Sequence, residues 1–236
     1  MQEESTILAI MTTSITDNTK TSSTYLNKYI IGLIVGILLL VPSLYIARKH
    51  QLTGLSAQIF YFFNNLPDLF KIPSLIVTEA LGAAYPIILC IAIPAFYKRF
   101  RLAWLFFVTV GGTGVVMTFF KLIAKEPRPA ELLNGHLHAR AIEVGLNSFP
   151  SGHAAVATAM ALTLLLILPK AYRWVAVLWI VVVGVSRIYL GVHTLTDVIG
   201  GFAIALIVFC IIQLLPNVIA KPLHLNKDKP LLERGF

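Results

Sequence analysis

Long apolar runs separated by short polar segments dominate the chain. Six of these runs carry few charges and approach the roughly 20 residues with which a helix crosses the bilayer core of about 30 Å. They cover residues 29–47, 73–97, 102–124, 151–168, 174–190 and 196–215. Alternating segments of about ten residues, typical of a membrane barrel, are absent from the sequence. The pattern predicts an all-α, polytopic membrane bundle of six transmembrane helices over residues 29–215.

A shorter amphipathic stretch lies between the first two runs. Its polar positions include Ser56 and Asn64, and its apolar residues recur at helical spacing. The apolar residues are Leu55, Ile59, Phe62, Phe63 and Leu66. We therefore predict a short interfacial helix between helices 1 and 2. Its aromatic face either guides a lipid tail laterally into the bundle or anchors the chain at the membrane surface.

Composition supports the membrane assignment. Of the 236 residues, 57% are hydrophobic and only 13% are charged, and the mean hydropathy is +0.81. These values exclude an ordinary soluble domain of this length. The net charge of +8 indicates contact with a membrane surface and with phosphate substrates, and no pattern in the sequence indicates nucleic-acid binding.

The positions of Lys and Arg predict the orientation, because cytoplasmic loops retain positive charge during insertion. The short loop with Lys98, Arg99 and Arg101 places both termini in the cytoplasm. Arg48 and Lys49 then lie on the outer side, which counts against this orientation.

Both ends of the chain are polar and lie outside the predicted bundle. Residues 1–28, rich in Thr and Ser, are expected to form a disordered tail. Residues 216–236 form a basic tail that is expected to touch the cytoplasmic leaflet.

Three polar motifs stand beside the ends of the apolar runs. They are residues 121–129 (KLIAKEPRP), 150–153 (PSGH) and 186–197 (SRIYLGVHTLTD). The third run ends at the first motif, the fourth begins at the second, and the third motif lies between the fifth and sixth runs. In six alternating spans, all these ends fall on the same side. The motifs are therefore predicted to share one membrane surface, which the charge rule makes the outer one.

The motifs supply the cations and donors that a phosphate group requires. Lys121, Arg128 and Arg187 provide three fixed positive charges, and a guanidinium group grips two phosphate oxygens at once. Ser151 and Gly152 stand at the predicted start of a helix, where the first free N–H groups point at an anion. These five residues are the predicted phosphate-binding set.

Two histidines provide the two roles that covalent phosphoryl transfer requires. His193 is the predicted nucleophile. Asp197 follows four residues later, one helical turn on, where its carboxylate can accept a proton from one ring nitrogen and present the other to phosphorus. His153 is the predicted acid that protonates the leaving group.

In order and spacing these residues resemble the type 2 phosphatidic acid phosphatase family, whose superfamily also includes vanadium haloperoxidases and glucose-6-phosphatase. Six residues separate Lys121 from the Arg128–Pro129 pair, and five separate Arg187 from His193. The six-run layout extends the resemblance over residues 29–215. It implies that His153 also activates the water that cleaves a phosphohistidine.

The sequence thus predicts an integral membrane lipid phosphatase that needs no metal or cofactor and works at the outer face of a bacterial cytoplasmic membrane. The main substrate choices are undecaprenyl diphosphate, phosphatidylglycerophosphate, phosphatidate and lipid A phosphate. One alternative is a phosphotransferase that passes the phosphoryl group from His193 to a second lipid. Another, outside the enzymes, is a lipid or ion transporter whose cationic cluster binds headgroups.

Three further polar residues are candidates for function. His136 and His138 form an HxH pair that suits a metal, but no further ordered ligand set accompanies it. Glu79 lies within the second apolar run, where an ionisable group serves function or pairs with a neighbouring span.

Small residues and cysteines in the spans predict packing rather than chemistry. Gly32 and Gly36 form a small-xxx-small pattern that predicts a close helix contact. Cys90 and Cys210 both fall within apolar runs, so a disulfide between them is not expected.

Overall fold

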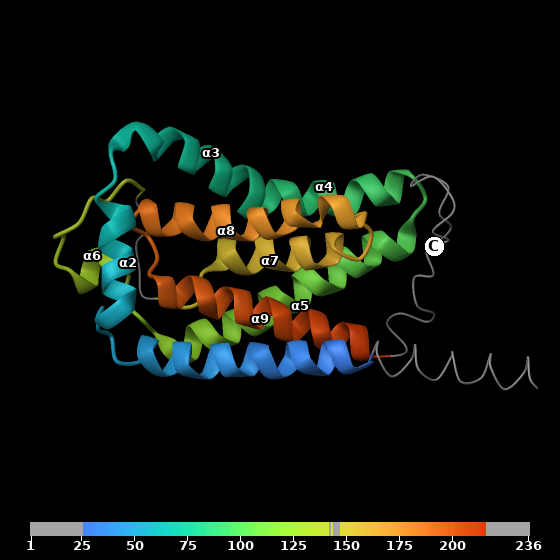
Figure 1. The fold of residues 1–236 in the computed structure, drawn as a ribbon, viewed down its shortest axis with the longest axis horizontal. Coiled ribbons are helices and arrows are strands. Elements are labelled where there is room, and N and C mark those ends of the chain that lie inside the picture. The colour runs from blue at the N-terminus through green and yellow to red at the C-terminus, as the bar shows by residue number, and fades with distance from the viewer. Residues whose placement is uncertain (1–25, 142, 144–146, 216–236) are drawn as a thin grey trace, which may run out of the picture.

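Long helices lie side by side in one bundle (Figure 1). The computed structural model describes residues 26–141, 143 and 147–215, and among these it contains helices and no strand. The first described helix covers Leu26–Ala47. The others are α2 (Gly54–Asn64), α3 (Lys71–Gly82), α4 (Ala84–Phe96), α5 (Phe100–Ala124), α6 (Pro129–Leu132), α7 (Gly152–Leu164), α8 (Arg173–Tyr189) and α9 (Leu195–Leu214). The predicted all-α fold is confirmed, and the predicted tails fall largely outside the described residues.

Four of the described helices are long and apolar enough to cross a membrane by themselves. They are Leu26–Ala47, Phe100–Leu132 with α5, Lys170–Tyr189 with α8, and α9, and the bent pair α3 and α4 raises the number to five. The remaining predicted span corresponds to α7, which has only 13 residues and is therefore about 20 Å long. The count of six spans stays a prediction.

The predicted span over residues 73–97 is broken into α3 and α4, which meet at 41°. Ala83 between them is extended, with φ −101° and ψ −161°. Pro86 is the third residue of α4, where its missing N–H does no harm. In a continuous helix its ring would clash with the carbonyl of Gly82, so the chain breaks between the two.

α7 lies at the centre of the bundle, where it contacts α3, α4, α5, α8 and α9. Small residues at its surface allow the neighbours to approach closely, and Ala155, Ala157 and Ala161 are fully buried. On α9, a Cβ at Gly201 would lie only 2.5 Å from the backbone oxygen of Ser151. The start of α7 is thereby held against the start of α9.

The first described helix packs against α9 through glycine, as the small-xxx-small pattern predicts. A Cβ at Gly32 would lie 2.7 Å from Cys210 Sγ, and one at Gly36 would lie 2.5 Å from Ile207 Cγ1. The close contact is confirmed. Cys90 and Cys210 are both free thiols.

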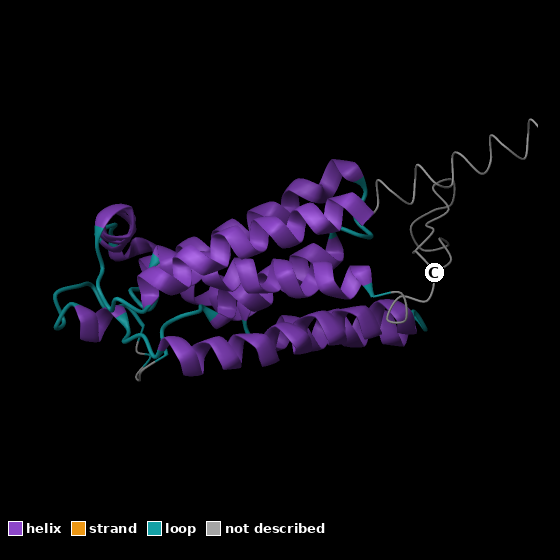
Figure 2. Ribbon diagram, turned by 90° about the horizontal axis from the view of Figure 1, so that it is seen from below, coloured by secondary structure: helices purple, strands orange, loops and turns teal. Residues whose placement is uncertain are grey.

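The predicted short helix between the first two spans is α2, which lies across one end of the bundle (Figure 1). Buried Asn64 fixes it there, because its amide donates to the oxygen of His138 at 2.9 Å and to the oxygen of Tyr189 at 3.3 Å. Figure 2 shows that loops gather at this same end. Here α5 and α8 end and α7 and α9 begin.

Candidate active site

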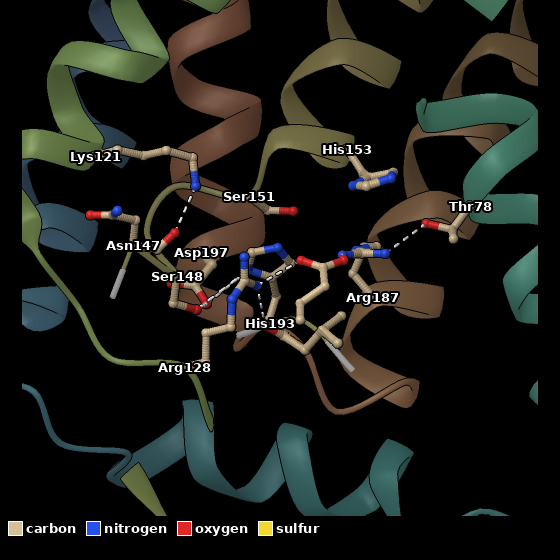
Figure 3. A network of polar contacts seen from close by, with 12 residues as sticks. Thr78, Lys121, Arg128, Asn147, Ser148, Ser151, His153, Arg187, His193 and Asp197 are labelled. Atoms are coloured by element: carbon tan, nitrogen blue, oxygen red, sulfur yellow. Dashed lines mark hydrogen bonds and ion pairs between the residues drawn. The ribbon is translucent and has the colours of Figure 1, made fainter. Parts of the chain in front are cut away.

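The predicted site residues all lie at the α2 end of the bundle, on segments far apart in the sequence (Figure 3). The N–H of Ser151 donates to the oxygen of Asp197 at 3.0 Å, which joins the second motif to the third. Arg128 donates to the oxygen of Val192 at 3.2 Å, which joins the first motif to the third. The three motifs therefore form one cluster.

His193 and Asp197 form an oriented pair. Nδ1 of His193 lies 3.4 Å from Oδ2 of Asp197, and both side chains are at most 2% exposed. The same carboxylate oxygen accepts from Ser148 Oγ at 2.7 Å and from the N–H of Thr194 at 2.8 Å. Thr194 in turn caps α9 by accepting from the N–H of Asp197. The carboxylate is fixed against Nδ1, so Nε2 is the ring nitrogen left for a reactant.

Burial sets the charge of His193. It lowers the pKa of this imidazole to about 4, although the neighbouring Asp197 acts in the opposite direction. The positive charges of Arg187 and Arg128 lower the pKa further. The ring is therefore neutral near pH 7, which is the form that carries a lone pair for attack.

The two predicted phosphate-binding arginines share one carboxylate. Arg128 NH1 lies 2.8 Å from Glu143 Oε2, and Arg187 NH2 donates to Glu143 Oε1. Arg187 is only 2% exposed and also reaches Thr78 Oγ1 at 3.4 Å. The two guanidinium groups are thus close enough to hold two oxygens of the same anion.

The electrostatic balance at Glu143 favours the charged carboxylate. Burial by itself would raise its pKa, but the charge and hydrogen bond of Arg187, together with the charges of His193 and Arg128, outweigh this effect. Together they hold the pKa of Glu143 at about 2. A full negative charge therefore lies between the arginines at neutral pH.

Lys121 lies in the last turn of α5, beside the arginine pair. Its Nζ donates to the oxygen of Asn147 at 2.7 Å. Electrostatic interactions connect it with Arg128, Arg187 and Asp197, so its charge contributes to the same cluster. In Figure 3 its ammonium group points towards the segment that carries Ser148.

The second motif begins α7. Ser151 is the N-cap, and its side chain accepts from the N–H of Ala154. The prediction that the Ser151 N–H is free for an anion is wrong, because the packing of α9 against α7 makes the Asp197 oxygen its acceptor. A Cβ at Gly152 would meet only Met117, at an ordinary 3.5 Å, so packing does not require glycine at this position.

Two of the neighbours that complete the cluster were not identified from the sequence. Ser148 and Glu143 both lie in the long loop before α7, which has no periodic pattern. An unusual density of polar residues between two apolar runs was the only available signal.

Arg140 fixes this loop to the bundle. It is 7% exposed and lies 2.6 Å from Asp68 Oδ1 and from the oxygens of Asn64 and Leu66. Its guanidinium also lies 4.3 Å from the ring centroid of Tyr189. The loop is therefore attached to α2 and to the end of α8.

The remaining predicted candidates differ in their surroundings. Backbone atoms of His138 pair with Asn64, and no three His, Cys, Asp or Glu side chains gather as a metal would require within the described part of the chain. Glu79, on α3, lies 3.7 Å from His153 Nε2.

Comparison with known proteins assigns the family. Residues 102–219, half of the chain, match the PAP2 superfamily. The chain belongs to the PAP2 superfamily.

Known relatives of this PAP2 chain act on lipid phosphates according to their names. It is 41% identical over 76 residues to phosphatidylglycerophosphatase B of Bacillus subtilis, covering 28% of this chain and 37% of the relative. It is 46% identical over 56 residues to undecaprenyl-diphosphatase of Sulfolobus acidocaldarius, covering 23% and 27%. These matches span about a third of the curated relatives' length.

A solved structure resembles the PAP2 chain over a larger part. The crystal structure of Aquifex aeolicus LpxE superposes with a TM-score of 0.61 at 26% identity, covering 69% of this chain and 96% of that one. Together with the apolar helices, these neighbours make this PAP2 protein an integral membrane protein.

Proposed function

We propose that this PAP2 protein is a membrane lipid phosphatase that removes a phosphate group from a phosphomonoester or diphosphate lipid. The observation that carries the proposal is the pair of arginines, Arg128 and Arg187, that shares one carboxylate beside a neutral histidine. A phosphate group presents the same pair of oxygens with more charge, so it takes the place of Glu143 between the guanidinium groups.

The reaction proceeds in two steps through a phosphohistidine. Nε2 of His193 attacks phosphorus, the bond from phosphorus to the lipid oxygen breaks, and His153 gives a proton to that oxygen. Water then attacks the phosphohistidine, His153 takes a proton from the water, and inorganic phosphate leaves. Asp197 stabilises the positive ring of His193 during the first step. Lys121 and the arginines neutralise the charge on the phosphoryl oxygens.

An apolar cavity beside the site suits the hydrocarbon tail of such a lipid. It has a volume of about 400 Å³ and lies between α2, α3 and α8, where Phe63, Leu66 and Val77 are among its lining residues. Ser186 also lines it and is the neighbour of Arg187 in sequence. A tail in this cavity therefore leaves its headgroup near the cationic cluster.

The substrate class follows from these two features. Undecaprenyl diphosphate, phosphatidylglycerophosphate, phosphatidate and lipid A phosphate all combine a long apolar tail with a terminal phosphate. The names of two relatives support the first two. We place the protein in a bacterial cytoplasmic membrane with the site on the outer face and both termini in the cytoplasm, without a metal or cofactor.

Phosphate release by the purified protein from this panel of lipids tests the proposal. His193→Ala should lower kcat by at least about 10⁴-fold, and His153→Ala by about 10² to 10³-fold. His136→Ala, an exposed histidine in the loop before α7, is the matched control and should keep full activity. Vanadate, which mimics five-coordinate phosphorus, should inhibit, and EDTA should have no effect.

Labelled substrate distinguishes the proposal from its alternatives. Label that appears as inorganic phosphate supports hydrolysis, whereas label on an acceptor lipid identifies a phosphotransferase. An acid-labile label on the protein that is lost in His193→Ala supports the phosphohistidine. Lipid transport that survives His193→Ala, without release of phosphate by the parent protein, would overturn the proposal.

A further inference from the structure

α3 forms a wall of the site that lies outside the three motifs and outside the family match, which begins at residue 102. Gly82 follows Thr78 by four residues and Glu79 by three, so it is a neighbour of each on the surface of this helix. Thr78 contacts Arg187 on α8, and a Cβ at Gly82 would lie 3.1 Å from Cβ of His153 and 3.2 Å from its Cδ2. Glycine thus allows α3 to lie directly against the His153 side chain.

On this face the carboxylate of Glu79 meets the ring of His153. Its Oε1 lies 3.7 Å from Nε2, and the side chains of Glu79 and His153 are 59% and 24% exposed. Hydrogen bonds of catalytic groups are commonly longer without substrate and shorten in the complex. The other charged groups around His153 are Arg187 on α8 and Glu143 in the loop before α7.

We propose that Glu79 is a positioning residue that holds Nε2 of His153 and directs its other ring nitrogen, Nδ1, to the leaving oxygen. The inference rests on the proposed function. When the bond from phosphorus to the lipid oxygen breaks, the proton on Nδ1 moves to that oxygen. The carboxylate of Glu79 accepts a hydrogen bond from Nε2–H, so it stabilises the positive ring before the transfer.

The pair of Glu79 and His153 resembles the pair of Asp197 and His193, because in each pair a carboxylate orients a histidine ring. Asp197 fixes Nδ1 of His193, and Glu79 fixes Nε2 of His153. It also accounts for an ionisable group in an apolar helix, which is costly unless it has a partner or a role.

The test compares two leaving groups. An alkyl lipid phosphate releases a strongly basic alkoxide, so its cleavage requires protonation of the leaving oxygen. p-Nitrophenyl phosphate releases a weakly basic phenolate, so its cleavage requires this proton much less. Glu79→Gln should lower kcat/KM, which reports the steps up to release of the leaving group, about 10-fold on the lipid, a fraction of the 10² to 10⁴-fold value of a general acid, and less than about 2-fold on the aryl ester. The comparison uses kcat/KM because kcat also includes the second step, for which His153 activates water on either substrate.

Three further variants make the result specific. His153→Ala should show the same preference for the aryl ester, and Glu79→Gln in the His153→Ala background should cause no further loss. Glu131→Gln, a matched exposed carboxylate on α6, should behave as the parent protein. Glu79→Asp keeps the carboxylate but places it further from the His153 ring. It should therefore also lower activity more on the lipid than on the aryl ester, by a smaller factor than Glu79→Gln.

Failure of this inference and failure of the proposed function are distinguishable. Equal losses on both substrates for Glu79→Gln or Glu79→Asp, or no loss, overturn the role of Glu79 while His153→Ala still shows the leaving-group effect. If His153→Ala itself shows no such effect, the proposed acid is wrong. If Glu79→Gln does not fold, Glu79→Asp decides the question by the same comparison.

Discussion

Replacing Glu143 by glutamine removes the negative charge that Arg128 and Arg187 share. Under the proposed function, the phosphate group of the substrate must displace this carboxylate in order to bind between the two arginines. The variant keeps the shape of the side chain, and its amide oxygen still accepts a hydrogen bond, but the charged competitor is gone. We therefore expect tighter binding of phosphate groups rather than a loss of activity.

The size of the effect follows from the pKa of Glu143, which is about 2 compared with an ordinary 4.5. At about 1.4 kcal/mol per pH unit, the arginines and their neighbours favour the carboxylate by roughly 3 kcal/mol. The side chain is 30% exposed, and the amide retains part of the contact, so solvent screening reduces the expected gain to about 1.5 kcal/mol. This corresponds to about a 10-fold change in affinity.

The assay measures KM for a lipid phosphate and inhibition by inorganic phosphate and vanadate. In Glu143→Gln both KM and the inhibition constants should fall about 10-fold. Because the carboxylate is ionised at every pH well above 2, the ratio to the parent protein should be constant from about pH 5 to 8. Glu131→Gln is the matched control. A higher KM together with a large loss of kcat would refute the reasoning, because Glu143 would then take part in the chemistry.

Three other predictions follow from particular contacts. Because the pKa of His193 in the free protein is about 4, its neutral form persists on acidification. After correction for ionisation of the substrate phosphate, kcat/KM should therefore decline near pH 4 to 5, and a decline centred at the ordinary histidine pKa of 6.5 would contradict this. Gly201→Ala places a Cβ 2.5 Å from the backbone oxygen of Ser151 and should abolish folding or activity. Gly114→Ala has open space around the new Cβ and should instead stabilise the protein by about 0.5–1 kcal/mol. Thermal unfolding in detergent measures both effects. In a variant without native cysteines, an impermeant maleimide should label His136→Cys in intact spheroplasts but Lys170→Cys only after lysis, and the reverse pattern would invert the proposed orientation.

The sequence predicted most of the fold because the bilayer restricts the choices. Apolar length alone located the long helices to within a few residues at most of their ends, and alternation of the predicted spans led to the expectation that the three motifs meet. The break at Ala83 was not predicted, although Pro86 was available as a signal. Hydropathy does not distinguish a proline in the first turn of a new helix from a proline in the middle of a continuous span, so Pro86 by itself did not reveal the break.

The residues around the site were harder to predict than the motifs themselves. Glu143 and Ser148 act through contacts with segments distant in sequence, and no helical spacing relates them to their partners. Glu79 was identified only as an unusual charge, because the packing of α3 against α7 depends on Gly82 and on the bend that follows it. For Ser151, the capping position was predictable, whereas the acceptor of its N–H depends on the approach of α9.

Because α7 is short, the site at its start lies inside the bundle rather than at the very end of the bundle. Figure 1 shows this helix beginning further inside the bundle than α8 ends and α9 begins, and Phe149 and Ser151 just before it are fully buried. Under the proposed function, a headgroup that reaches His153 therefore lies deeper in the bundle than the end of α8, with its tail in the apolar cavity between α2, α3 and α8. The water for the second step then has to follow the phosphate inward.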